Sequence, residues 1–368
     1  MSNLNPEDYT VGWISAILPE YTAAQLCLDE KHEPVRLPPG NKDQYTLGRI
    51  GNHNVVISVL PMGEYGTASA ARVAESMTNS FPNIRIALMV GIGGGAPSRK
   101  HDIRLGDIVV GIPDNGEGGV LHYDFGKTIQ DQSFKATGFV NQPPTILLTA
   151  VNGLAAQYEL EGNGIEDTIT EILADKPRLR RKFARPDTAS DRLYKTNVVH
   201  PIDSEMNCVD SCGINKSDLI SRSERTKDMD NPMVHYGLIA SANNLMKDAI
   251  IRDQLSKEQD VLCFEMEAAG LVNHFPCLII RGICDYADSH KNKDWQRYAA
   301  MVAVVYAKDL LYKIHSHNVE YEKAIVNVLK AGDVHRNTYI KFEGNNSGVQ
   351  IGQMNGSFTN SGNLPVWR

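Results

Sequence analysis

The sequence predicts an α/β fold, a single domain with a central mixed, largely parallel β-sheet flanked by helices. The first observation is an alternation: short apolar runs rich in β-branched residues are separated by helical stretches along most of the 368 residues. The second is the place of the acidic residues, several of which directly follow an apolar run. Because ligands of parallel sheets bind beyond the carboxyl ends of the strands, these acids indicate a binding site at that edge.

Seven segments carry the strand pattern. Each is a short apolar run enriched in residues that favour extended backbone. In chain order, the predicted strands are residues 9–17, 53–60, the first part of 85–97, 106–113, 233–241, 260–266 and 276–284.

Three further segments are typical of helices. Residues 19–30 place Pro19 in the first turn, where its missing N–H is not needed. A glycine-rich turn at 61–67 leads into a helix of small residues at 68–81. The Ala-rich segment 295–316 predicts a long helix that packs closely on its neighbours.

A run of glycines follows the strand that begins near residue 85. The run reads GIGGGAP, and we expect a turn in which Gly91, Gly93 and Gly94 let the backbone approach a ligand closely. It is not a GxGxxG motif, because position 96 is Ala, and no GK[ST] follows as a Walker motif requires. The glycines alone therefore do not establish a nucleotide-binding fold.

The expected organisation has four parts. A short N-terminal tail precedes one folded domain, which contains an inserted basic loop region and ends in a polar tail rich in Gly and Asn. The expected ranges are 1–8 for the N-terminal tail, 9–330 for the domain, 175–230 for the insertion and 331–368 for the C-terminal tail.

Two of these parts leave alternatives open. Residues 175–195 hold eight basic and three acidic residues, which fits a solvated surface loop or a clamp for an anionic substrate. In the tail, 15 of the 19 residues from 344 to 362 are Gly, Asn, Ser, Gln or Thr. That composition fits disorder, or a short β-segment through which chains self-associate.

Composition excludes several classes of protein. The net charge of -7 argues against a general nucleic-acid binder. The polar, acidic N-terminus is not a secretory signal, and the apolar runs are too short to span a bilayer. Six cysteines in such a chain indicate reduced thiols in the cytoplasm. Cys208 and Cys212 form a CxxxC, interpreted as unpaired thiols because no second ligand pair has zinc-site spacing, so no metal is expected.

Three acids at predicted strand ends are the candidates for chemistry: Glu20, Glu267 and Asp285. An acid at a helix start is common because the helix dipole favours it, which is the alternative interpretation of Glu20. Three acids on one rim instead favour general acid and general base work. Such pairs suit reactions through an oxocarbenium-like sugar cation, where one acid assists the leaving group and another activates water.

Several motifs together resemble the nucleoside phosphorylase and nucleosidase superfamily over residues 9–315. The spacing of EMEAAG and RGICDYAD, some 18 residues apart, is the most specific of these signals. The full set is SAILPEYTAA, MVGIGGGAPSRKHDIRLGDIVVG, HYDFGK, HYGLIASANNLMKD, FEMEAAG and IIRGICDYAD. Within the superfamily, the chain is most similar to fungal nucleosidase-like domains that often open larger immune-receptor-like proteins.

The resemblance implies a role for each motif residue. Asp285 protonates purine N7, although Cys284 stands where many relatives have Ser. Glu20 activates the attacking water. Glu265 is expected to support the helix start or to face outward. The implied ribose-binding residues are Glu267 and Met266, and the implied base-binding residues are Leu245, Met246, Asn243 and Asn244, without the aromatic residue that relatives often have there.

The resemblance is compatible with two reactions, hydrolysis and phosphorolysis. The turn ILPEYT has neither the GDP nor the Arg of phosphorylases, and Met89 precedes the glycines where many phosphorylases carry Arg. A carboxylate there would repel phosphate and activate water, so a purine nucleosidase is favoured over a phosphorylase. A third hypothesis is a sensor that binds nucleosides without cleaving them.

The substrate implied by the resemblance is an adenine nucleoside or nucleotide, adenosine or ATP. Clustered basic residues suit phosphate. The candidates are Arg99, Lys100, Arg104 and Arg181. Hydrolysis of ATP would deplete the nucleotide, which suits a role as an immune effector. No cofactor, nucleic acid or membrane is expected, and relatives imply a homo-oligomer.

Overall fold

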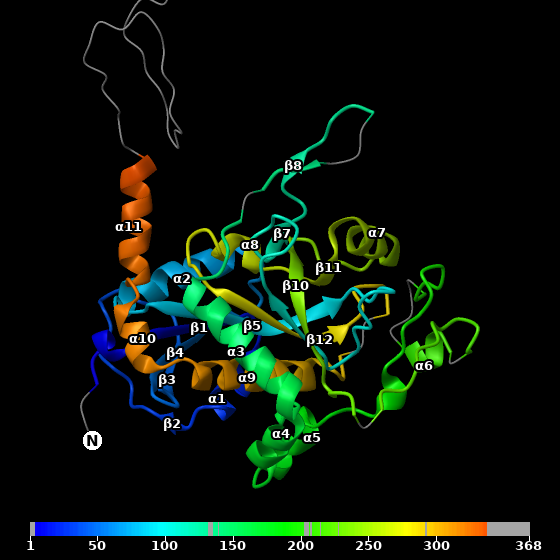
Figure 1. The fold of residues 1–368 in the computed structure, drawn as a ribbon, viewed down its shortest axis with the longest axis horizontal. Coiled ribbons are helices and arrows are strands. Elements are labelled where there is room, and N and C mark those ends of the chain that lie inside the picture. The colour runs from blue at the N-terminus through cyan, green and yellow to red at the C-terminus, as the bar shows by residue number, and fades with distance from the viewer. Residues whose placement is uncertain are drawn as a thin grey trace, which may run out of the picture.

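The computed structural model describes residues 4–131, 135–138, 140–201, 206, 208–213, 215–226, 228–290 and 293–336. Its centre is a mixed sheet in the order β11-β10-β6-β12-β5-β1-β4-β3-β2, with β7 paired to β10 (Figure 1). Strand β11 also pairs with β5, through Cys263 opposite Gly95 and Phe264 opposite Gly94. This pairing closes part of the sheet into a barrel and confirms the predicted α/β fold.

The strands of this sheet form where the sequence is most apolar. β5 and β12 are buried along almost their whole length, which explains their continuous apolar runs. The strands are β1 (Val11–Ser15), β2 (Glu30–Lys31), β3 (Tyr45–Ile50), β4 (His53–Val59), β5 (Ile86–Gly95), β6 (Ile108–Gly111), β7 (Val120–His122), β10 (Val234–Ser241), β11 (Val261–Glu265) and β12 (Leu278–Asp285). A separate hairpin joins β8 (Gly126–Lys127) and β9 (Lys135–Ala136).

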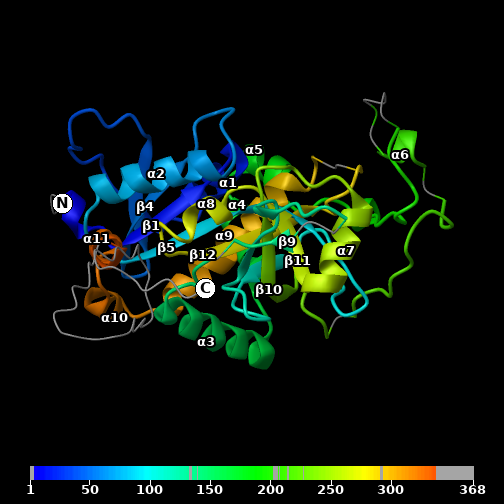
Figure 2. The same ribbon diagram turned by 90° about the horizontal axis from the view of Figure 1, so that it is seen from above.

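Helices cover both faces of the sheet (Figures 1 and 2). α9 (Gln296–Lys313) packs on β5 and β12, and α1 (Leu18–Leu26), α3 (Thr145–Glu161), α4 (Ile165–Leu173) and α5 (Pro177–Phe183) pack on α9. α2 (Thr67–Ser80) and α8 (Ala268–Leu271) pack together on the opposite face, and α7 (Ala249–Gln259) lies beside β11. The remaining helices are α6 (Cys208–Ser211), α10 (Ser316–Tyr321), α11 (Ile325–Arg336) and two 3₁₀ turns at Pro6–Asp8 and Thr188–Ser190.

The buried face of α9 explains the predicted helix at 295–316. Its Ala and Val side chains are almost fully buried. Gly282 of β12 lies directly beneath this helix, and a Cβ there would collide with the carbonyl oxygen of Ala299. Small residues on both elements therefore bring α9 close to the sheet, with β12 directly below it.

The structure corrects three expectations. The predicted glycine turn at Gly91, Gly93 and Gly94 is extended backbone, because β5 continues through Gly95. The segment 175–195 is not all loop, since α5 is helical and buries Phe183 against the core. The folded part does not end at residue 330, because α11 continues to Arg336. The tail segment at 344–362 lies outside the described residues.

No helix among the described residues combines the length and apolar character needed to cross a membrane.

Candidate active site

A cavity of about 160 Å³ lies at the carboxyl ends of β5, β11 and β12, beside the start of α1. The cavity therefore lies at the edge of the sheet where the acidic residues predicted a binding site. The cavity brings together most of the residues predicted from sequence. Those that line it are Glu20, Gly93, Gly94, Leu245, Met246, Met266, Glu267 and Asp285.

Glu20 is held by three backbone N–H groups. Its Oε2 accepts from Ala16 at 2.6 Å and Ile17 at 3.1 Å, and its Oε1 accepts from Ile92 at 2.8 Å. The bond from Ile17 is the helix-start contact that the alternative interpretation foresaw. The bond from Ile92 is different, because it fixes the carboxylate against β5. Burial raises the pKa of Glu20, against Arg281 and the three N–H groups, which lower it.

The glycines of β5 make room for charged side chains. A Cβ on Gly91 would lie 2.5 Å from Glu20 Oε1 and 2.8 Å from Arg281 Nη1. A Cβ on Gly94 would lie 2.6 Å from Asp285 Oδ1. Four of the five residues of the GIGGG run are glycines, so acids from neighbouring elements can pack against this part of β5.

Arg281 is a charged residue of the site that the sequence analysis missed. It lies in β12 with 1% of its surface exposed and forms an ion pair with Glu265. Its Nη2 is 3.9 Å from Glu267 Oε2. Although burial lowers it, the carboxylates of Glu265, Glu267 and Glu20 hold the pKa of Arg281 above its usual range. The signal in the sequence was a lone arginine inside the apolar run LIIRGIC.

Glu265 supports the start of α8, as expected, but it does not face outward. Its carboxylate accepts from the N–H groups of Glu267 and Ala268, each at 3.1 Å, and only 6% of the residue is exposed. It lines the cavity beside Glu267. Its ion pair with Arg281 makes it the counter-charge of this site.

Glu267 lies between two charges of opposite sign. It is buried, and it accepts from the N–H of Gly66 at 3.4 Å. Burial and the neighbouring Glu265 raise the pKa of Glu267 to about 7, against the effect of Arg281. The pKa of this carboxyl group therefore lies in the physiological range, unlike that of an ordinary surface glutamate.

Asp285 ends β12 and is 8% exposed. Its Oδ1 accepts from the N–H of Ala287 at 2.9 Å, in a tight turn where Ala287 has φ of 50°. The Cys284 thiol donates to Oδ2 at 3.7 Å. Cysteine therefore supplies a hydrogen bond at the position where many relatives have serine.

The four predicted base contacts divide into two pairs. Leu245 and Met246 line the cavity, but Asn243 and Asn244 do not. Asn243 accepts instead from the backbone N–H and the hydroxyl of Thr67, both at 3.1 Å. Asn244 is exposed, and its carbonyl accepts from Tyr123. The asparagines thus fix the loops at the mouth of the site.

Two aromatic side chains in the cavity wall were not foreseen. Phe264 is buried at the end of β11 and contacts Tyr123 edge to face. Tyr65 comes from the loop before α2 and is 56% exposed. These rings offer flat apolar surface near the position where the sequence motif lacks an aromatic residue. The sequence around Tyr65 has no motif that indicates a contact with the cavity, because this loop reaches the cavity only in the folded chain.

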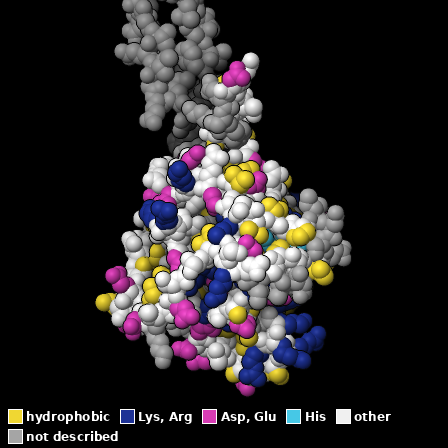
Figure 3. All heavy atoms as spheres, turned by 90° about the vertical axis from the view of Figure 1, so that its right-hand side faces the viewer, with side chains coloured by type: hydrophobic (Ala, Val, Ile, Leu, Met, Phe, Trp, Pro, Cys, Tyr) yellow, Lys and Arg dark blue, Asp and Glu magenta, His cyan; other side chains and the backbone are white. Residues whose placement is uncertain are grey.

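None of the predicted phosphate contacts lines the cavity. Lys100 pairs with Asp260, and Arg104 pairs with Asp102 at 2.5 Å. Arg99 is exposed, as is Arg181 on α5. Figure 3 shows Lys and Arg side chains gathered at the lower end of the insertion-side face. Within the basic segment itself, Arg181 is exposed, whereas Arg185 is only 22% exposed and pairs with Glu166.

Bacterial enzymes are among the solved structures that this chain resembles. A 5′-methylthioadenosine/S-adenosyl homocysteine nucleosidase of Helicobacter pylori superimposes with a TM-score of 0.52 and 13% identity, over 83% of this chain and 99% of that one. A futalosine hydrolase of the same species gives 0.50 and 14%, over 83% and 98%. The Neisseria meningitidis methylthioadenosine nucleosidase gives 0.50 and 15%, over 83% and 97%. This chain has the nucleosidase fold. The resemblance predicted from its motifs is confirmed at that level.

A fungal protein is similar in sequence. The chain is 47% identical over 310 residues to a nucleotide-binding leucine-rich repeat (NLR)-like protein of Hyaloscypha variabilis. The match covers 84% of this chain but only 30% of the relative's length. This similarity agrees with the predicted link between the nucleosidase fold and fungal immune-receptor-like proteins. No family model matches the chain.

Proposed function

We propose that this chain is a purine nucleosidase, which hydrolyses the N-glycosidic bond of an adenine nucleoside or nucleotide such as adenosine or ATP. One observation carries the proposal. Glu20 in the first turn of α1, Glu267 just after β11 and Asp285 at the end of β12 line a single cavity with an apolar wall. That arrangement supports acid, base and sugar-binding work in one place.

The proposed reaction assigns each acid one step. Asp285 gives a proton to purine N7 as the C1′–N9 bond breaks, so the base leaves neutral. Glu267 accepts hydrogen bonds from the ribose hydroxyls, and its negative charge stabilises the positive charge that develops on the sugar in the transition state. Glu20 takes a proton from water, whose oxygen attacks C1′ and forms the ribose product. A raised pKa suits Glu20 for this role, because a general base works best near ambient pH.

The charges around the cavity favour water over phosphate as the attacking group. Among the described residues that line it, there is no lysine or arginine. Arg281 lies behind the carboxylates and is engaged by Glu265 and Glu267. Inorganic phosphate would meet acids without a free cation, whereas water needs only a base. Hydrolysis is therefore the proposed reaction and phosphorolysis the alternative.

The proposed setting is the cytoplasm, where the chain acts as a homo-oligomer. Similarity to an NLR-like protein supports a role as an immune effector that depletes its nucleotide. Methylthioadenosine nucleosidases among the solved structures support a purine nucleoside substrate.

The test is release of adenine from adenosine, AMP and ATP, each with and without inorganic phosphate, followed by chromatography. Wild type is compared with Asp285→Asn and with Asp260→Asn. Asp260 is the matched control, because it directly precedes β11, does not line the cavity and has a φ of 54° that Asn tolerates.

The outcomes separate the hypotheses. Adenine released without phosphate, retained in Asp260→Asn and lost in Asp285→Asn, supports the nucleosidase. Release only with phosphate would replace hydrolysis by phosphorolysis. Wild-type protein that binds adenosine but releases no adenine from any substrate would instead be a nucleoside sensor.

A further inference from the structure

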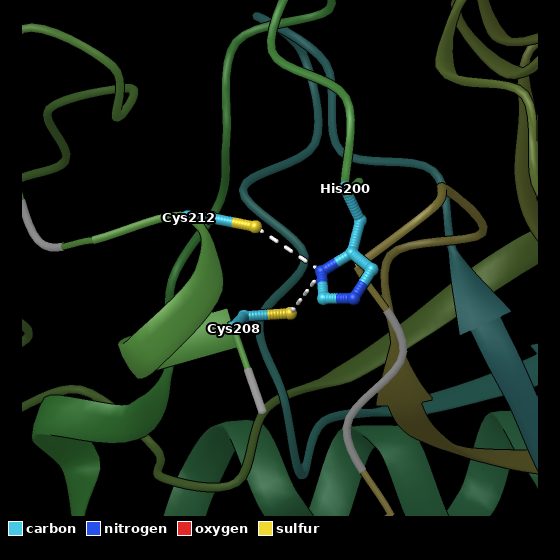
Figure 4. A group of neighbouring side chains, drawn as sticks. All are labelled: His200, Cys208 and Cys212. Atoms are coloured by element: carbon cyan, nitrogen blue, oxygen red, sulfur yellow. Dashed lines mark hydrogen bonds between the residues drawn. The ribbon is translucent and has the colours of Figure 1, made fainter. Parts of the chain in front are cut away.

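Three metal-ligating side chains meet in the inserted segment, away from the cavity. His200, Cys208 and Cys212 place their ligand atoms within 4.8 Å of one another. Cys208 opens α6 and Cys212 directly follows it, while His200 lies eight residues upstream of Cys208. Figure 4 shows both sulfur atoms and the imidazole ring pointing toward one another. The thiols are not joined in a disulfide.

One nitrogen faces both sulfurs. His200 Nδ1 is 3.1 Å from Cys212 Sγ and 3.5 Å from Cys208 Sγ. An imidazole nitrogen offers either one hydrogen or one lone pair, so it cannot form two full hydrogen bonds to two thiols. A central ion resolves this conflict because it bonds to all three atoms. For tetrahedral zinc, Zn–S and Zn–N bonds of about 2.3 and 2.0 Å imply N···S separations of about 3.5 Å.

A fourth side chain beside the cluster is buried without hydrogen bonds. His290 is 7% exposed, and neither of its ring nitrogens has a hydrogen-bond partner among the described residues. Its ring stands edge-on to His200, with centroids 6.2 Å apart, and stacks on Tyr194 at 3.9 Å. Nδ1 lies 3.6 Å from Asp288 Oδ2. Burying an imidazole whose ring nitrogens form no hydrogen bond costs folding free energy unless something binds the ring.

We propose that His200 Nδ1, Cys208 Sγ and Cys212 Sγ bind one Zn²⁺, with His290 placed to supply the fourth ligand. Two thiolates and two imidazoles form a closed tetrahedral set, which is typical of structural zinc. Binding releases the two thiol protons to solvent, and no electrons are transferred. Zinc binding here does not require the chain to be a nucleosidase.

The position of the site gives the zinc a structural role. His290 belongs to the loop that follows Asp285, and the His200 N–H donates to Ser289 Oγ of the same loop at 3.0 Å. Zinc would join His200 and α6, which is labelled at the right of Figure 1, to this loop. The ion would therefore fix the turn in which Asp285 lies without touching a substrate.

The spacing explains why the sequence alone favoured unpaired thiols. Cys208 and Cys212 lack a second pair at zinc-finger spacing. His200 and His290 are 90 residues apart in the chain and meet only because the insertion folds back on the loop after β12.

The test measures metal in the full chain, purified without a histidine tag or chelator from zinc-supplemented cells. We expect about one zinc per chain in wild type and less than about 0.2 in Cys208→Ser/Cys212→Ser. Two controls keep wild-type zinc: Cys27→Ala removes a buried thiol outside the cluster, and His274→Ala removes an exposed imidazole.

A second measurement does not depend on how the variants fold. Wild type is stripped of metal under reducing conditions and titrated with Co²⁺, which gives a thiolate-to-cobalt charge-transfer band when two cysteines bind it. That band, displaced by Zn²⁺, supports the site. Folded wild type that binds neither ion, equal zinc in the double-serine variant, or an intact mass that lacks the two thiol hydrogens would each overturn it.

Discussion

At the residue scale, the absence of a side chain at position 94 decides where Asp285 can lie. A Cβ on Gly94 would come within 2.6 Å of Asp285 Oδ1 and 2.9 Å of Ala287 Cβ. Asp285 Oδ1 accepts from the Ala287 N–H, and Ala287 belongs to the tight turn after β12, so neither neighbour moves aside freely. The glycine therefore lets the proposed acid lie close against β5.

We expect Gly94→Ala to fold with reduced stability and to lose activity about 100-fold, because a shift of about 1 Å in a catalytic group has effects of this size. Gly153→Ala is the control, since nothing lies within 4 Å of its added Cβ and Ala favours the surrounding helix. Adenine release by both folded variants is the measurement. Full activity in Gly94→Ala would show that Asp285 tolerates displacement.

Glu267 makes stability depend on pH at this same site. Burial raises its pKa from 4.5 to about 7, so the folded protein binds more protons than the unfolded chain between these values. The free energy of unfolding therefore falls as pH rises from about 4.5 to about 7, by at most about 3 kcal/mol. The glutamine side chain does not ionise, so a Gln at position 267 avoids this loss of stability.

We expect Glu267→Gln to melt at a higher temperature than wild type at pH 8 and at the same temperature near pH 4. Thermal unfolding without substrate is measured at both values. Glu64→Gln, an exposed carboxylate in the loop before α2, should match wild type at each pH. A Glu267→Gln variant no more stable than wild type at pH 8 would contradict the raised pKa.

At the scale of elements, one ion pair crosses the barrel. Arg281 on β12 and Glu265 at the end of β11 do not lie on adjacent strands, because β5 runs between them. The side chains meet over the glycines of β5, where Gly91 leaves room for Arg281 and Glu20. The same glycines thus permit both the proposed base and the charge pair behind it.

We expect Arg281→Met to destabilise the protein by about 3–5 kcal/mol, because it leaves Glu265 buried without a counter-charge. Arg281→Met/Glu265→Gln should recover most of this loss. Arg49→Met on β3 is the control, since its pair with Glu30 is exposed and worth less than about 1 kcal/mol. Denaturant unfolding measures all three, and equal losses in the single and double variants would argue against the pair.

The elements that could be predicted from sequence are those whose own residues decide their state. β1, β4 and β12 are apolar runs, and Pro19 marks the start of α1. The glycines of β5 predicted a turn because glycine has only a weak preference for any backbone conformation and is common in turns. Their extended conformation comes from pairing with β12 and β11, which lie far away in sequence.

The candidate site followed the same rule. Glu20, Glu267 and Asp285 were predicted because each sits in a local motif at a strand end. Arg281 was missed, since its partners are defined only when the barrel closes. The wall residues Tyr65 and Phe264 were also missed, because the cavity assembles them from distant segments.

At the scale of the whole molecule, the described core ends with α11. Ile325 is 2% exposed, and its N–H donates to the Ile84 carbonyl at 2.8 Å, which ties the helix to the loop before β5. The cavity takes no residue beyond Gln296. Catalysis and the C-terminal tail are therefore expected to be separable.

We expect a chain ending at Arg336 to melt with wild-type cooperativity and to release adenine at the wild-type rate per chain. A chain ending at Lys323 is the control, which should lose stability because it removes Ile325 and its hydrogen bond. Sedimentation of the full and shortened chains at several concentrations tests the tail as an assembly element. If the full chain associates and the chain ending at Arg336 does not, the tail drives assembly. If both associate alike, assembly belongs to the nucleosidase fold, and a chain ending at Arg336 that loses activity would show that catalysis needs the tail.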